Sequence, residues 1–348
     1  MKHIFHIHSQ INVLISMLIV EVKQLNVEDV LFVCFRGVEA PSSIKFTCIL
    51  SNQIYLHPFN SPRNLYKLKF FENRKYIKVV DDVVDKFIGG EDFIYYAPHC
   101  RNPIYSVFIS HEKCRQVHYI EDGGDAYLSE KALLKKFPNR IHWSHYCVKY
   151  IFRVFPSSMV ERLPTYASMY SDIGIRKSIC YGLDKISFRT SLSPNRKILR
   201  VPERFGKLVS YKVRAKNVFV FDALVEQNVV SIEMYAEFLD WFLSGRYKEK
   251  EIAIKFHPFQ SNEFKRLVME RFGKFGLTVE ILPQSVNMEL LILFSKDLVV
   301  YGVGSSLLMY ALLKSRENTH VLYPYFTERL GESCTRKHMW ESMFHEYI

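Results

Sequence analysis

Short apolar runs alternate along the chain with segments whose apolar residues recur every three or four positions. The chain opens with a short β-rich run at residues 3–8, His-Ile-Phe-His-Ile-His, which is followed by Ser9 and by an apolar-periodic stretch over residues 12–22. A short apolar run is typical of a buried strand, whereas the longer spacing is typical of a helix that starts at a serine N-cap. We therefore predict that the chain begins with a strand and a helix.

The same alternation continues through both halves of the chain. In the first half, further strands are predicted at residues 30–35, 76–80, 92–96 and 116–120. In the second half, strands at 217–221, 251–256, 277–282, 297–301 and 319–323 alternate with helices that begin after Ser231, at Asn262 and near residues 286 and 306. This order predicts α/β architecture with parallel sheets that are covered by helices on both faces.

A chain of 348 residues is long enough for two domains, each with its own core. The segment 187–216 lacks sustained periodicity and contains nine Lys or Arg residues. We therefore predict an N-terminal domain over 1–190, a linker over 191–216, and a C-terminal domain over 217–348 that ends in a helix.

Composition narrows the class of protein and of partner. The seven cysteines are scattered and never spaced as CxxC, which argues against a disulfide framework or a zinc site and fits a reducing cytoplasm. The apolar stretch at 11–20 is too short to span a membrane. The net charge of +11 favours an anionic partner. Nucleic acid is not expected, because the sequence has neither zinc-finger spacing nor an RNP-like aromatic run.

The strand predicted at 116–120 leads into Glu121-Asp122-Gly123-Gly124. Ligands of open α/β sheets bind at the carboxyl ends of strands, so two acids in a glycine turn at this position are candidates for a general base. The alternative is a turn or helix cap with solvated acids.

A second candidate is His257-Pro258, after the strand predicted at 251–256. Pro258 ends the strand and holds His257 in an extended conformation, where its ring can contact a phosphate or protonate a leaving group. The alternative is a terminal histidine bonded to a carbonyl.

A third candidate is the run Gly302-Val303-Gly304-Ser305-Ser306, where a strand turns into a helix. Free N–H groups, hydroxyls and the positive end of a helix dipole meet there, as in an anion site. The run is neither a Walker loop nor a complete GxGxxG motif. The alternative is a tight turn capped by serine.

In this order, Glu121-Asp122-Gly123, His257-Pro258 and Gly304-Ser305-Ser306 resemble the motifs of bacterial sialyltransferases and polysialyltransferases. The resemblance covers about residues 90–325. It implies a GT-B fold, in which two Rossmann-like doubly wound domains face a central cleft. It also implies that the C-terminal domain binds CMP-sialic acid and that the acceptor lies on the N-terminal side.

The resemblance also implies roles for individual residues. Glu121 is the favoured base, and Asp122 lies beside it. His257, which Pro258 follows, would contact the CMP phosphate or assist its departure. Ser305-Ser306, after Gly304, would hold that phosphate. Glu289 matches a glutamate that binds the cytidine ribose, although an acid at a helix N-terminus is the alternative. In some lipooligosaccharide sialyltransferases the base follows the first strand of the C-terminal domain, which makes Asp222 and Glu226 rival bases.

The implied reaction is inverting transfer of sialic acid to a hydroxyl of a lipooligosaccharide or capsule glycan. No metal or other cofactor is expected, because the chain has no convincing DxD motif and a monophosphate leaving group needs less neutralisation. Acceptor identity and linkage stay open. The alternatives are another CMP-sugar transferase, such as one that moves Kdo, and a non-catalytic protein that binds a glycan or membrane.

Residues 131–155 interleave basic and aromatic side chains, which makes peripheral docking on an anionic inner membrane an alternative to a plain helical wall. These residues are Lys131, Lys135, Lys136, Arg140, Lys149 and Arg153 with Trp143, Tyr146, Tyr150 and Phe152.

Overall fold

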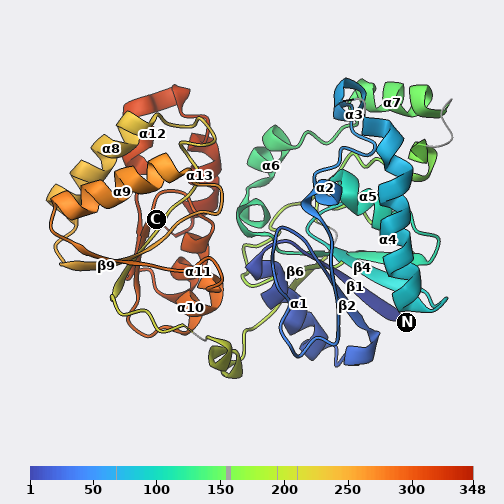
Figure 1. Cartoon of the computed structure of the whole chain (residues 1–348), viewed down its shortest axis with the longest axis horizontal. Coiled ribbons are helices and arrows are strands. Elements are labelled where there is room, and N and C mark those ends of the chain that lie inside the picture. The colour runs from blue at the N-terminus through green and yellow to red at the C-terminus, as the bar shows by residue number, and fades with distance from the viewer. Residues whose placement is uncertain (68, 154–157, 194, 210, 348) are drawn as a thin grey trace. The chain divides into compact units, whose positions relative to one another are not determined.

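The computed structural model describes residues 1–348 except 68, 154–157, 194, 210 and 348; the side chains of 65, 66 and 152 are also outside the description. The chain folds into two compact units, Met1–Val201 and Pro202–Ile348 (Figure 1). The division falls inside the segment 191–216 that the sequence assigned to a linker.

The first unit is built on a seven-stranded sheet in the order β3-β2-β1-β4-β5-β6-β7. Every pairing between its named strands is parallel. The strands are β1 (Lys2–Ile7), β2 (Val30–Cys34), β3 (Phe46–Ile49), β4 (Phe93–Ala97), β5 (Cys114–Ile120), β6 (Cys180–Gly182) and β7 (Arg196–Ile198).

Helices connect these strands. The side chain of Ser9 accepts the Asn12 N–H and caps the first helix, as the sequence predicted. The α-helices are α1 (Gln10–Val22), α2 (Asn52–Tyr55), α3 (Arg63–Lys67), α4 (Asn73–Ile88), α5 (Pro103–Ile109), α6 (Glu130–Lys136) and α7 (Trp143–Arg153). Short 3-10 turns are η1 (Val27–Asp29), η2 (Lys69–Glu72), η3 (Gly123–Tyr127) and η5 (Val160–Arg162).

The strand predicted at residues 76–80 is wrong, because these residues lie inside α4. Tyr76, Ile77 and Val80 begin a series that continues to Val84 and Ile88, and all of them are buried on one side of the helix. Their spacing of three to four residues is helical, and it overrides the preference of isoleucine and valine for strands.

Three strands were missing from the prediction: β6, which has only three residues and lies between β5 and β7, and the edge strands β3 and β7. In β3, exposed and half-buried residues alternate over only four positions. In β7, inside the expected linker, all three residues are exposed. An edge strand pairs through its backbone on one side only and needs no apolar run.

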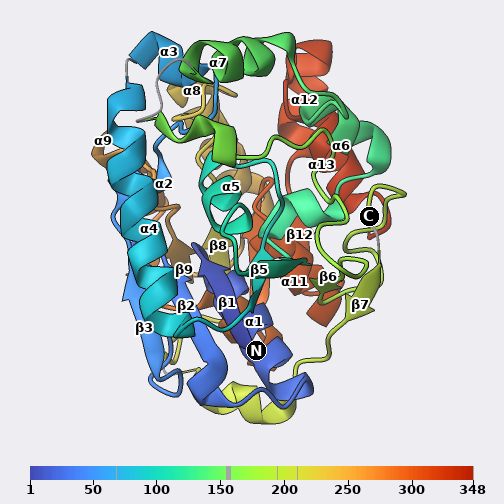
Figure 2. The ribbon, with the colours of Figure 1, turned by 90° about the vertical axis from the view of Figure 1, so that its right-hand side faces the viewer.

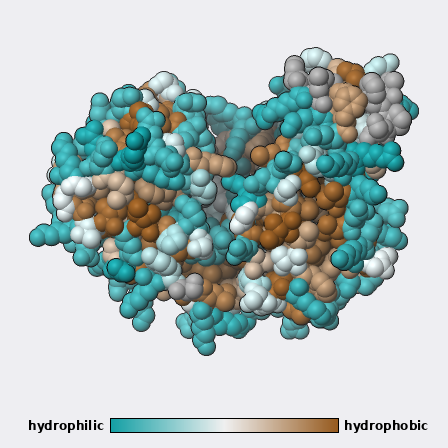
Figure 3. All heavy atoms as spheres, in the orientation of Figure 1, coloured by the Kyte–Doolittle hydropathy of each residue, from teal (hydrophilic) through white to brown (hydrophobic). Residues whose placement is uncertain are grey.

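Figure 3 shows apolar side chains gathered on the face of this unit between α1 and α4.

The second unit has a five-stranded sheet in the order β10-β9-β8-β11-β12, and its named strands also pair in parallel. The strands are β8 (Asn217–Val220), β9 (Glu251–Lys255), β10 (Thr278–Ile281), β11 (Val299–Gly302) and β12 (Thr319–Val321). Each coincides with a predicted strand, so the β/α series of this half is confirmed.

In this unit α8 packs beside α9, and α10 beside α11, on opposite sides of the sheet (Figure 1). The helices are α8 (Ile232–Trp241), α9 (Asn262–Lys274), α10 (Met288–Phe294), α11 (Leu307–Lys314), α12 (Pro324–Leu330) and α13 (Lys337–Phe344), with turns η6 (Glu203–Leu208), η7 (Phe242–Arg246) and η8 (Gly331–Ser333).

Both strand orders reverse direction next to the first strand of the unit, between β1 and β4 and between β8 and β11. Right-handed crossovers that run in opposite directions from such a point place their helices on opposite faces of the sheet. The predicted α/β class, with two Rossmann-like doubly wound sheets, is confirmed.

Candidate functional sites

In the first unit, polar side chains gather where β1, β4 and β5 end. His8 follows β1, His99 follows β4, and Asp122 follows β5. These three strands are neighbours, and the strand order reverses between β1 and β4. Ligands of open α/β sheets bind at such a reversal point, outside the carboxyl ends of the strands.

The two residues after β1 hold the carboxylate of Asp122. His8 Nε2 lies 2.9 Å from Oδ2, and the Ser9 hydroxyl donates to Oδ1 at 3.3 Å. Burial raises the pKa of Asp122, but the charges and hydrogen bonds of the neighbouring His8, His99 and Ser9 outweigh burial and leave it below its usual value. Asp122 is therefore ionised at neutral pH, and an ionised carboxylate only accepts, so His8 carries its proton on Nε2.

Glu121, the acid that the sequence favoured, lies in a different environment. Its side chain is completely buried; the Tyr127 hydroxyl donates to Oε1 at 2.7 Å, and the Leu183 N–H donates to Oε2 at 2.9 Å. These bonds tie the end of β5 to η3 and to the residue after β6. The side chain of Asp122 is 30% exposed. Of the two acids, Asp122 is the one that a substrate can reach.

His8, Ser9 and Asn12 were not recognised as site residues in the sequence. The Asn12 side chain donates to the backbone carbonyl of Glu121 at 2.9 Å and so fixes the strand end that carries both acids. The sequence feature that could have identified them is the position of His8-Ser9 directly after the first strand, because polar residues at that position of a doubly wound sheet face ligands.

In the second unit, Asp222 follows β8, His257 comes shortly after β9, and Gly304 shortly after β11, so the structure brings these predicted residues to one edge of the sheet. The Gly304 N–H donates to Asp222 Oδ2 at 3.0 Å. One of the donors expected to bind an anion therefore already binds a carboxylate. Burial raises the pKa of Asp222 to about 7 despite this hydrogen bond.

Ser305 and Ser306 lie between Gly304 and α11, where the sequence placed them. The Ser305 hydroxyl accepts the Leu307 N–H at 3.3 Å, and both serines are only partly buried. Trp340 of α13 packs directly on Gly304: a Cβ atom on Gly304 would lie 1.8 Å from the indole Nε1. Only glycine fits there, and the C-terminal helix thus contributes to the turn, which the sequence did not show.

The ring of His257 is oriented by its own turn. His257 Nδ1 accepts the Phe259 N–H at 3.2 Å, so the proton of the neutral ring is on Nε2. The His257 N–H donates to the side chain of Gln260, whose amide donates to the Asp222 carbonyl at 3.3 Å. The two hydrogen bonds of Gln260 therefore join the segments that follow β8 and β9. Pro258, between His257 and Phe259, is exposed.

Glu226 and Glu289 are each placed at a helix N-terminus. Glu226 Oε1 accepts the N–H and hydroxyl of Ser261, the N-cap of α9. Glu289 lies in the first turn of α10; burial raises its pKa to about 7, although the positive charge of Lys255 opposes the shift. Burial also lowers the pKa of Lys255 to about 8.

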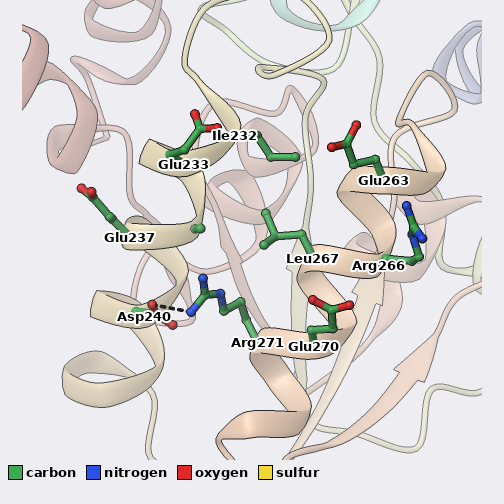
Figure 4. Close-up of a pocket in the computed structure, with 10 residues that line it drawn as sticks. Ile232, Glu233, Glu237, Asp240, Glu263, Arg266, Leu267, Glu270 and Arg271 are labelled. Carbon is green, nitrogen blue, oxygen red and sulfur yellow. Dashed lines mark hydrogen bonds and ion pairs between the residues drawn. The ribbon is translucent and has the colours of Figure 1, made fainter.

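A groove of about 640 Å³ lies elsewhere in this unit, between α8 and α9 (Figure 4). Five acids and two arginines line it, and Arg271 pairs with Asp240 across it at 2.9 Å. None of the predicted site residues lines this groove.

No family model matches the chain, and no curated protein matches it. Similar solved structures include UDP-GlcNAc 2-epimerases from Neisseria meningitidis, bound to UDP-GlcNAc (10% identity, TM-score 0.41, 99% of this chain and 94% of that chain), and from Methanocaldococcus jannaschii (12%, 0.44, 98% and 91%). Another is the spinosyn rhamnosyltransferase (9%, 0.42, 99% and 94%). Similarity at this level decides neither family nor activity.

The contact between Gly304 and Trp340 predicts the effect of Gly304→Ala. The added methyl group must displace the indole, and the free energy of unfolding should fall by about 1–3 kcal/mol in chemical denaturation. The matched control is Gly273→Ala in α9, where nothing lies within 4 Å of the new methyl group. In a Trp340→Leu background the Gly304→Ala loss should shrink; an equal loss in both backgrounds would contradict the contact.

The raised pKa of Asp222 predicts a pH dependence of stability. Between about pH 4 and pH 7 the carboxyl ionises in the unfolded chain but stays protonated in the folded chain, so it destabilises the fold increasingly as pH rises. The free energy of unfolding of Asp222→Asn minus that of the wild type should therefore rise over this interval, by up to about 4 kcal/mol, and stay level above it. A difference that is flat from pH 4 to pH 7 would refute the assignment.

Proposed function

We propose that this chain is an inverting, metal-independent glycosyltransferase of the GT-B class that moves sialic acid from CMP-sialic acid to a hydroxyl of a bacterial cell-surface glycan, in the cytoplasm. The main support is that each unit gathers its candidate groups at its own reversal point. The first has a carboxylate held by His8 and Ser9. The second has the Gly304-Ser305-Ser306 turn and an oriented His257.

In this proposal Asp122 is the general base. It is ionised at neutral pH, partly exposed and held by two donors, so it can accept the proton of an acceptor hydroxyl. His8 is then a positioning residue, because its Nε2–H fixes the carboxylate. Glu121, the base by resemblance, supports the strand end instead. Asp222 and Glu226 stay rivals, although the first accepts from Gly304 and the second from Ser261, the N-cap of α9.

The donor would lie on the second unit. Ser305, Ser306 and the N–H groups of the turn would hold the CMP phosphate, and His257 Nε2–H would donate to it. Glu289 would accept hydrogen bonds from the ribose hydroxyls. The acceptor oxygen forms a bond to the anomeric carbon as the bond to the phosphate oxygen breaks; CMP leaves with the electron pair, and the anomeric configuration inverts.

The test is release of CMP from CMP-sialic acid in the presence of galactosyl and sialyl acceptors. Asp122→Asn should lower kcat by about 10²–10⁴-fold, because the base is lost. Asp125→Asn is the matched control: it lies in the next turn, is also 30% exposed, and pairs with Lys136. Glu121→Gln should lower thermal stability more than kcat. If Glu121→Gln abolishes turnover in a folded protein while Asp122→Asn does not, the base is Glu121.

The same assay separates the alternatives. CMP release from CMP-Kdo but not from CMP-sialic acid would identify the donor as Kdo. Absence of CMP release with either donor and every acceptor, or with water, would contradict the enzymatic proposal and favour a non-catalytic glycan-binding protein.

Metal independence is tested separately. Because the turn and His257 are proposed to neutralise a single phosphate, turnover should be unchanged within about twofold after treatment with EDTA. Loss of turnover with EDTA, and its recovery on addition of Mg²⁺ or Mn²⁺, would show that a cation contributes to catalysis.

A further inference from the structure

Helix α7 exposes a stripe of aromatic side chains. Trp143, Tyr146 and Tyr150 are 68%, 60% and 79% exposed. Their spacing of three and four residues places them on one side of the helix, and Val148, which is completely buried, marks the other side. Large aromatic side chains this exposed are typical of a binding surface.

A fourth exposed aromatic residue comes from a distant part of the chain. Phe71 of η2 is 68% exposed. Its neighbour Phe70 packs against Val148 of α7 and Val160 of η5, which brings η2 beside α7. Figures 1 and 2 both show α3, which precedes η2, next to α7. Because Val148 lies on the side of α7 opposite the stripe, Phe71 is not counted with it, and we call the surface formed by Trp143, Tyr146 and Tyr150 the α7 surface.

Positive charge surrounds the α7 surface. Residues 138–153, which contain it, have three basic residues, Arg140, Lys149 and Arg153, and no acid. Residues 63–75, part of which packs beside α7, add five Lys or Arg residues and one acid, Glu72. Lys67, Lys69 and Arg153 are exposed, and Lys149 is partly exposed.

We propose that the α7 surface docks on an anionic lipid bilayer. Trp and Tyr side chains favour the interface between headgroups and acyl chains, and Lys and Arg are attracted to anionic headgroups. Among the residues that the structure describes, no helix is long and apolar enough to cross a membrane, so α7 would lie along the interface. A second copy of this chain is a poor occupant, because symmetric contact would bring two basic surfaces together.

This surface differs from the segment 131–155 that the sequence indicated. Lys136 of α6 forms an ion pair with Asp125 at 2.5 Å, so it is directed to η3. The side chain of Phe152 and residues 154–157 lie outside the described residues. The α7 surface keeps Trp143, Tyr146 and Tyr150 of that segment, with Lys149 and Arg153 on the same helix. The proposal does not depend on the reaction that the chain catalyses.

The test is co-sedimentation of the full chain with vesicles of phosphatidylcholine and phosphatidylglycerol in a 3:1 ratio. The triple variant Trp143→Ala/Tyr146→Ala/Tyr150→Ala should lower the partition coefficient at least tenfold. Lys149→Glu/Arg153→Glu should lower it similarly and weaken its dependence on salt. The matched control is Leu56→Ala/Ile175→Ala, which removes two apolar side chains that are each 75% exposed elsewhere on the unit. Circular dichroism and thermal unfolding confirm that each variant is folded.

The wild type should bind these vesicles at 0.15 M salt and bind pure phosphatidylcholine far more weakly. Equal binding of the triple variant and the wild type would overturn the proposal. So would absence of binding to anionic vesicles, or a wild-type dimer in analytical ultracentrifugation that the triple variant loses.

Discussion

The parallel pairing of the strands decides where chemistry can gather in this protein. A parallel strand must be followed by a crossover before the next strand begins, so all strands of one sheet end at the same edge. Residues that follow different strands therefore meet there without being close in sequence. His8 and Asp122 are 114 positions apart, yet their side chains are separated by 2.9 Å. Asp222 and Gly304 are brought together in the same way.

Three carboxylates at these edges differ mainly in how their charge is compensated. Burial of an ionised carboxylate is costly unless donors replace water. Glu121 is completely buried and accepts hydrogen bonds from Tyr127 and Leu183. Asp122 has two donors and partial exposure, and its pKa is lowered. Asp222 has the Gly304 N–H at one oxygen, while Oδ1 is buried with no hydrogen-bond partner among the described residues, and its pKa is raised.

The local pattern predicted most strands because a buried parallel strand is a short apolar run, and it predicted where polar residues follow those runs. It failed where two signals compete, as in α4, and where a strand pairs only at an edge, as in β7. The local pattern does not show which strands pair with one another across the sheet. That His8 contacts Asp122, or that Trp340 covers Gly304, depends on strand order and on the path of a terminal helix, which no short window encodes.

The contact between Asp222 and Gly304 also constrains how an anion can bind the turn. A phosphate beside Ser305 and Ser306 would share this corner with a carboxyl group whose pKa is about 7. Two negative charges in one corner repel, so under the proposed function a bound phosphate would raise the pKa of Asp222 further. By linkage, protonation of Asp222 would then strengthen phosphate binding by the same factor. Near neutral pH, binding of the anion would therefore be coupled to uptake of a proton, and departure of the anion would release that proton.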